Sequence, residues 1–175
     1  MKHEMSEADL NLLRLTSPIR SSLAKRVLTL IAKHPSDVEL LPGVGLHFRD
    51  QPLPPTGYFY EPSFAVILQG AKRIKLGDSV FHYDASRFLL TSMNLPTTTE
   101  VLGATEDDPY VSVLIKLNLD IAREVLADLE LNNYGEICSD SGMATGPATN
   151  EMLELVSKTL DLCDYSGNPA YLWGI

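Results

Sequence analysis

The stretch that decides the fold is residues 71–84, AKRIKLGDSVFHYD. Gly77-Asp78 divides it into two short runs and suits a two-residue hairpin turn with glycine at the first central position. Directly opposed residues of a hairpin share a face, so we predict that Ile74 and Phe81 point into a core while Arg73 points away. The predicted register pairs Leu76 with Ser79, Ile74 with Phe81, and Arg73 with His82.

The same two-residue period extends over residues 37–117, which predicts a β-barrel or sandwich there. The proline-rich residues 52–55 are expected to form an extended loop inside this domain, because strand patterns continue on both sides. The predicted strands are Gly45–Arg49, Phe64–Gln69, Lys72–Leu76, Val80–Tyr83, Phe88–Ser92, Thr97–Leu102 and Tyr110–Leu117.

Residues 1–36 have a helical period and form the predicted N-terminal helical segment. Ser6 with Asp9 is typical of a helix start, and Ser17-Pro18 predicts a second start, because proline fits a first helical turn. His34-Pro35 is expected to end this second helix.

Residues 118–175 form the predicted C-terminal helical region, with Asn118 as a helix cap and a connection over 134–145. The helix expected over 148–163 is apolar around more than one stripe, so it is either buried in the domain or covered by a partner subunit. The residues that we expect at a dimer interface are Met152, Leu155, Val156 and Thr159.

The composition excludes several functions. The chain has 175 residues and a formal net charge of −9, which makes it a poor binder of nucleic-acid phosphates. Its two cysteines cannot build a disulfide framework, and it shows neither a signal peptide nor a membrane-length apolar run. We therefore expect a cytoplasmic protein.

No catalytic or metal-binding motif stands out. The four histidines, His3, His34, His47 and His82, include no His-x-His pair, and no serine lies in a Gly-x-Ser-x-Gly elbow. The cluster Lys72-Arg73-x-Lys75 is interpreted as a solvated strand face. We therefore expect no catalytic residue, no cofactor and no metal.

The interior of the predicted barrel has apolar walls, which suit either a small ligand or a core filled by side chains. The residue pattern alone leaves both alternatives open. If the interior is hollow, the residues expected to line an effector pocket are Val66, Leu68, Ile74, Phe81, Val113 and Ile115.

Ordered motifs across residues 58–131 resemble the N-terminal domain of AraC-type transcriptional regulators. The motifs that carry the resemblance are Tyr60-Glu61-Pro62-Ser63-Phe64, Val66-Ile67-Leu68-Gln69-Gly70-Ala71-Lys72, Gly77, Tyr83-Asp84, Leu89-Leu90-Thr91-Ser92 and Leu95-Pro96.

The resemblance implies a mainly β protein with flanking helices: a cupin-like β-barrel, an N-terminal helical segment and C-terminal dimerisation helices. It further implies a homodimer, a possible small-molecule effector, and DNA binding through a C-terminal helix-turn-helix domain that these residues do not include. A possible helix start at Asn168-Pro169 lies close to the last residue, so we expect the sequence to be part of a longer protein. The alternatives are a stand-alone cupin-type enzyme acting on a small molecule and an isolated ligand-binding module.

Overall fold

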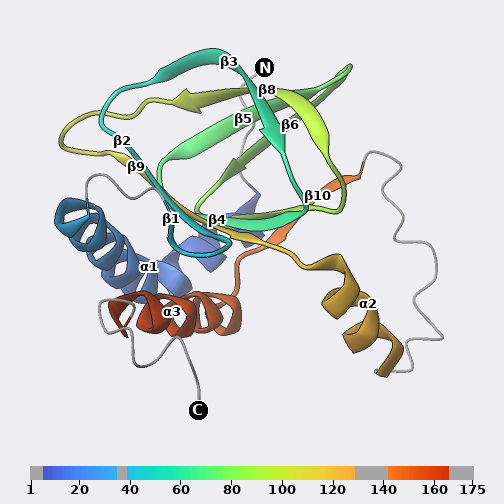
Figure 1. The fold of residues 1–175 in the computed structure, drawn as a ribbon. Helices are drawn as coiled ribbons and strands as arrows, with labels where there is room; N and C mark the ends of the chain where they lie inside the picture. The colour runs from blue at the N-terminus through green and yellow to red at the C-terminus, as the bar shows by residue number, and fades with distance from the viewer. Residues whose placement is uncertain (1–5, 35–38, 129–141, 166–175) are drawn as a thin grey trace.

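The computed structural model describes residues 6–34, 39–128 and 142–165. There the chain forms two antiparallel sheets that face each other, with two helices packed on the outer face of the larger sheet (Figure 1). A third helix, α2 (Leu119–Asp128), projects away from the sheets (Figure 1). The mainly β fold with flanking helices is thus confirmed, in the form of two sheets around an interior.

The larger sheet has six strands and the smaller has four. In both sheets, several neighbouring strands come from distant parts of the chain. In spatial order the larger sheet contains β1 (Glu39–Leu41), β2 (Val44–Arg49), β9 (Tyr110–Lys116), β4 (Ser63–Gln69), β7 (Arg87–Thr91) and β10 (Met143–Pro147). The smaller sheet contains β3 (Leu53–Tyr60), β8 (Leu95–Leu102), β5 (Ala71–Leu76) and β6 (Ser79–Asp84).

The β5–β6 hairpin has the register predicted from its turn. Ile74 lies opposite Phe81, and Gly77 adopts a φ of 57°, in the left-handed region that favours glycine. Ile74 is fully buried between the sheets. The seven predicted strands are all present, and the alternating pattern missed two further strands of this region, β1 and β3.

The proline-rich stretch is a strand and not the expected loop. β3 pairs with β8, and the pairing is irregular between Leu53 and Thr56, where Pro54 and Pro55 lie. Proline lacks the N–H that a sheet ladder requires, so prolines are confined to edge strands and bulges. β3 meets both conditions, because it forms the edge of its sheet and contains the irregularity.

The N-terminal segment forms one continuous helix, α1 (Glu7–Lys33), with Ser6 as its cap, as predicted, and an end just before His34. The second start predicted at Ser17-Pro18 is wrong, because Pro18 lies inside the helix.

Two polar side chains bind carbonyls of the turn that precedes Pro18. The missing N–H leaves one backbone carbonyl without its usual partner. On the neighbouring turn the Thr16 hydroxyl donates to the carbonyl of Leu12 at 2.8 Å, and the Arg20 guanidinium donates to the carbonyl of Leu13. Arg20 also donates to the Thr16 hydroxyl at 2.8 Å, which holds this turn together.

A strand lies in the region predicted to be a connection and helices. β10 pairs with β7 at the edge of the larger sheet, so residues 118–175 contribute one strand beside α2 and α3 (Asn150–Tyr165). The strand contains Gly146 opposite Phe88, and a Cβ atom at Gly146 would lie 2.5 Å from Phe88 Cζ. Glycine weakens a strand pattern in the sequence, but here it admits the aromatic ring.

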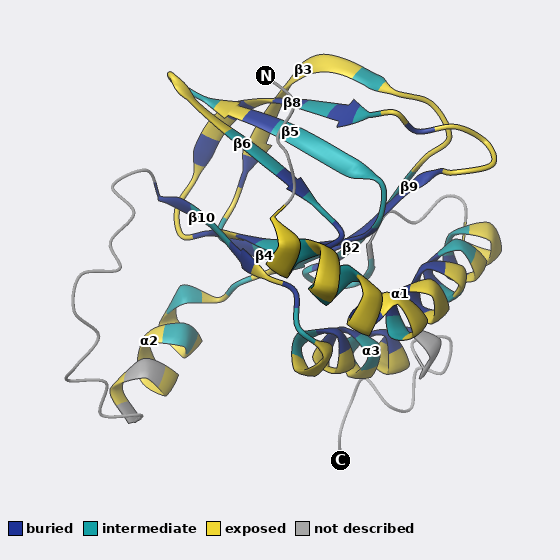
Figure 2. Cartoon of the chain, turned by 180° about the vertical axis from the view of Figure 1, so that it is seen from behind, coloured by how far each residue is buried: buried dark blue, intermediate teal, exposed yellow. Residues whose placement is uncertain are grey.

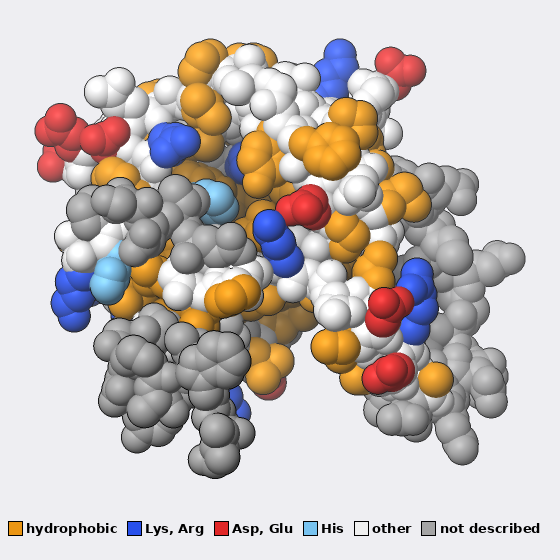
Figure 3. Space-filling model, in the orientation of Figure 1, with side chains coloured by type: hydrophobic (Ala, Val, Ile, Leu, Met, Phe, Trp, Pro, Cys, Tyr) orange, Lys and Arg blue, Asp and Glu red, His pale blue; other side chains and the backbone are white. Residues whose placement is uncertain are grey.

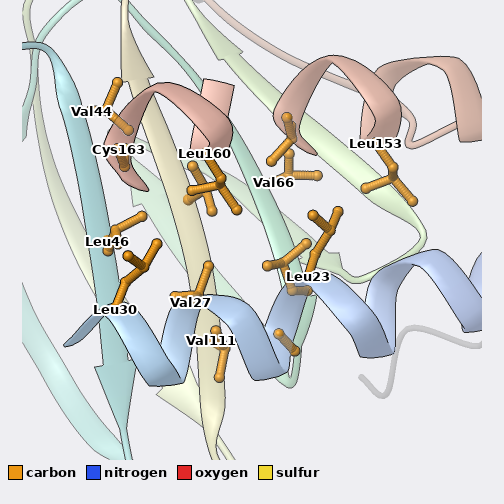
Figure 4. Close-up of a cluster of buried hydrophobic side chains, with 14 of the residues drawn as sticks. Leu23, Val27, Leu30, Val44, Leu46, Val66, Val111, Leu153, Leu160 and Cys163 are labelled. Carbon is orange, nitrogen blue, oxygen red and sulfur yellow. The ribbon is translucent and has the colours of Figure 1, made fainter. Parts of the chain in front are cut away.

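Two hydrophobic clusters lie on opposite faces of the larger sheet. One fills the space between this sheet and the helices α1 and α3, which contribute Leu23, Val27, Leu153 and Leu160 (Figure 4). The other lies between the two sheets and includes Ile74. Figure 2 shows the result, with buried positions on the strands and on the inner faces of α1 and α3.

None of the described helices is long and apolar enough to cross a membrane. Residues 134–141 of the predicted connection and the possible helix start at Asn168-Pro169 lie outside the described residues.

Candidate functional site

A cavity of about 90 Å³ lies between the two sheets, and we call it the interior cavity. It opens toward the face shown in Figure 3, where a hollow lies among hydrophobic, basic and histidine side chains. Seven strands contribute to its wall. The lining residues are His47, Arg49, Leu53, Tyr58, Tyr60, Ala65, Lys72, Tyr83, Thr99, Val101, Tyr110, Ser112 and Leu114.

None of the six residues expected to line an effector pocket is among them. On β4 and β9 the inward and outward faces are the reverse of the expected ones, since Val66 and Val113 lie in the cluster beneath the helices. Leu68 lies in the same cluster and Ile115 packs against it. Ile74 and Phe81 do point between the sheets, as expected, but beyond the cavity wall.

The reversal has a physical cause. The larger sheet is covered on one face by α1 and α3 and on the other by the smaller sheet, so the middle of β4 is buried on both faces. An apolar residue on such a strand does not indicate which face looks inward. The more apolar face of β9 packs on the helices, and the face with Tyr110 and Ser112 looks into the cavity.

Lys72 places its ammonium group in the interior cavity. Its Nζ donates to the Tyr60 hydroxyl at 3.1 Å and lies 5.3 Å from the ring centroid of Tyr58 and 5.5 Å from that of Tyr60. Burial lowers the pKa of Lys72 to about 8, and the positive charge of Arg49 adds to the effect. Lys72 belongs to the cluster interpreted as a solvated face, but it shares the inward face with Ile74, two residues along the strand.

His47 lies on β2 beside these cations. Burial lowers the pKa of His47 to about 4, and the charges of Lys72 and Arg49 contribute further, so the imidazole is neutral near pH 7. Gly45 makes room for the ring, because a Cβ atom there would lie 3.2 Å from His47 Nε2. The sequence pattern indicated His47 only as a candidate metal ligand and did not predict its position at the cavity.

Tyrosines form much of the remaining wall. Burial raises the pKa of Tyr110 to about 12 and raises those of Tyr60 and Tyr83 as well, so all three phenols are neutral at physiological pH. Tyr83 has hydrogen-bond interactions with Tyr60 and Tyr110, and Tyr110 with Ser112. The described part of the wall therefore offers neutral hydroxyl groups and basic side chains but no carboxylate.

No group of three or more potential metal-ligating side chains occurs among the described residues. Cys163 is a buried thiol in the core beneath α3. The interior cavity is thus equipped to bind a small molecule through hydrogen bonds, charge and apolar contact.

A two-sheet domain with a small polar cavity between its sheets has an architecture in which small ligands are commonly bound. The family model for the N-terminus of AraC-type transcriptional regulators matches residues 40–173, and the chain belongs to this family. The resemblance identified in the sequence is confirmed.

Among solved structures, the chain is similar to ToxT from Vibrio cholerae, with a TM-score of 0.46 and 12% identity over 66% of this chain and 46% of that chain. A second ToxT structure, bound to (E)-4-(8-methylnaphthalen-1-yl)but-3-enoic acid, has a TM-score of 0.46 and 13% identity over 67% of this chain and 46% of that one. The chain thus spans about half of these proteins. At a TM-score of 0.46 this likeness by itself defines neither fold nor function. No curated protein matches the chain significantly.

Proposed function

We propose that this chain is the effector-sensing and dimerisation region of an AraC-type transcriptional regulator. The observation that carries the sensing role is the interior cavity, a polar space in the middle of an otherwise close-packed domain. Cavities with a few convergent polar groups are the usual sites of small ligands. The role is regulatory and non-enzymatic, as in the family.

The dimerisation role rests on one side of α3. Leu155 and Leu162 are 61% and 60% exposed, and together with Met152 and Thr159 they follow a spacing of three, four and three residues. This spacing is the seam of a two-helix coiled coil. Three of the four residues expected at a dimer interface lie on this stripe.

Val156, the fourth, is 1% exposed in the core between α3, α1 and the larger sheet, so it is not available to a partner.

DNA binding belongs to a part of the regulator outside these residues. The net charge of −9 repels phosphates, and the matching family is defined as the N-terminus of a regulator. A regulator of this kind acts in the cytoplasm, where it meets DNA. Two such chains held together would present two DNA-binding domains to paired half-sites, and an effector that changes the pairing would change transcription.

Sedimentation of this chain and its Leu155→Asp variant tests the dimerisation role. We expect a wild-type dimer and a folded Leu155→Asp monomer, because a charge on the stripe cannot be buried against a partner without a large free-energy cost. The control is Glu154→Lys, a charge change about 100° around the same helix, which should leave the dimer intact.

Val156→Asp should unfold the chain instead of separating two folded copies, because it places the charge in the chain's own core. A wild-type chain that sediments as a monomer at high concentration would refute the dimerisation role.

A further inference from the structure

Three basic side chains meet at the interior cavity: His47 and Arg49 from β2, and Lys72 from β5. They are close enough to affect one another, because the charges of Lys72 and Arg49 disfavour protonation of His47, and that of Arg49 disfavours protonation of Lys72. Among the described residues no Asp or Glu lines the cavity, so the described wall holds no acidic side chain to balance this positive charge.

Within the described part of the chain, Lys72 contacts neutral groups and no carboxylate. Its hydrogen-bond partner is the hydroxyl of Tyr60, which is neutral, and the nearby rings of Tyr58 and Tyr60 interact with the ammonium only through their faces. Burying an ammonium group without a counter-ion costs free energy. Such an arrangement inside a cavity marks a candidate ligand site.

The remaining wall and the size of the cavity restrict the ligand. Leu53, Val101 and Leu114 provide an apolar surface beside the basic groups. The volume of about 90 Å³ equals about three water molecules at about 30 Å³ each. A carboxylate with a short apolar chain fits these conditions, since it combines one negative charge with a small hydrophobic body.

We propose that the interior cavity binds a small aliphatic carboxylate, whose charged group pairs with Lys72 and whose chain lies against Leu53, Val101 and Leu114. This inference rests on the proposed sensing function and names the chemical class of its effector. Arg49 is exposed at the cavity and attracts the anion. His47 is neutral near pH 7 and is available for a hydrogen bond to it.

The test is a nuclear magnetic resonance titration of the isotope-labelled chain with butyrate and with butyramide, which has nearly the same shape and no charge. We expect butyrate to shift the signals of cavity residues and to bind at least about tenfold more tightly than butyramide, because bonds to charged groups are the stronger ones. Lys72→Met should weaken butyrate binding at least about tenfold. The matched control, Lys75→Met, alters an exposed lysine on the other face of β5 and should change binding less than about twofold.

Equal binding of butyrate and butyramide would overturn the carboxylate proposal and leave a sensing cavity for neutral ligands. Unchanged butyrate affinity in Lys72→Met would also overturn it. The absence of butyrate binding up to about 50 mM, well beyond a millimolar dissociation constant, would do the same. Failure of the dimerisation role would appear separately, as a wild-type monomer in sedimentation.

Discussion

The ammonium group of Lys72 lies 3.1 Å from the hydroxyl oxygen of Tyr60, in the space between the two sheets. This contact joins β5 to β3, which lie on either side of β8 in the smaller sheet. It satisfies one of three ammonium hydrogens and supplies no negative charge. The ammonium group thus lies beside a neutral hydroxyl and near the positive charge of Arg49, which leads to the first prediction.

Lys72→Met should stabilise the chain at pH 7 by about 1 to 3 kcal/mol, because it removes a half-buried charge that contacts no carboxylate among the described residues. The pKa of Lys72 is lowered from 10.5 to about 8, so between these values the unfolded chain binds more protons than the folded chain. The stability of the wild type relative to Lys72→Met therefore rises with pH in this window.

The gain in stability of Lys72→Met over the wild type should accordingly be largest below about pH 8 and should decrease toward pH 10.5. Urea denaturation at pH 7 and pH 10 measures it, with Lys75→Met as the control for removing a lysine from β5. An advantage that is absent at pH 7, or that stays constant between the two pH values, contradicts the prediction.

Pro18→Ala should stabilise the chain. The substitution restores an N–H inside α1, where proline costs up to about 3 kcal/mol, and we expect a gain of about 1 to 3 kcal/mol. Thermal denaturation should show a higher Tm for Pro18→Ala and a nearly unchanged Tm for the exposed neighbour Ser17→Ala. A loss of stability would mean that Pro18 starts an independent helix, as its position in the sequence suggested.

Gly146→Ala should destabilise the attachment of β10 to β7. The new Cβ would lie 2.5 Å from Phe88 Cζ, so the ring must move, and overpacking of this kind costs about 1 to 3 kcal/mol. Gly57→Ala on β3 is the control, because a Cβ there meets no atom within 4 Å. Hydrogen exchange of the β10 amides would report the local effect. Equal protection of β10 in the wild type and in Gly146→Ala would show that Phe88 moves without cost.

Much of the fold could be predicted because it depends on the local alternation of apolar and polar residues and on the residues that start helices and form turns. The alternation on both sides of Gly77-Asp78 predicted the register of the β5–β6 hairpin. Ser6 predicted the start of α1, and Asn118 that of α2, where its side-chain oxygen accepts from the N–H groups of Asp120 and Ile121. Each of these features involves residues within a few positions of one another.

Elements that depend on a distant neighbour were missed. β10 carries a glycine and a proline, and it is a strand because β7 offers it an unpaired edge. β3 contains two consecutive prolines, which the edge position tolerates. Pro18 lies inside α1, and helix residues before and after it, Leu13 and Leu23, pack against the two hydrophobic clusters.

The sequence by itself determined that this chain is a mainly β domain with flanking helices, of the AraC-type family. Its net charge of −9 predicts that these residues do not bind DNA. The tertiary structure decided which face of each strand looks into the cavity. Val66 and Ala65 are both buried, one beneath the helices and the other at the cavity wall, because both faces of the larger sheet are covered. A binary pattern of apolar and polar residues does not distinguish two buried faces. For the same reason the sequence did not predict the cavity or the position of Lys72 in it, because the cavity forms only where the smaller sheet packs across the larger one.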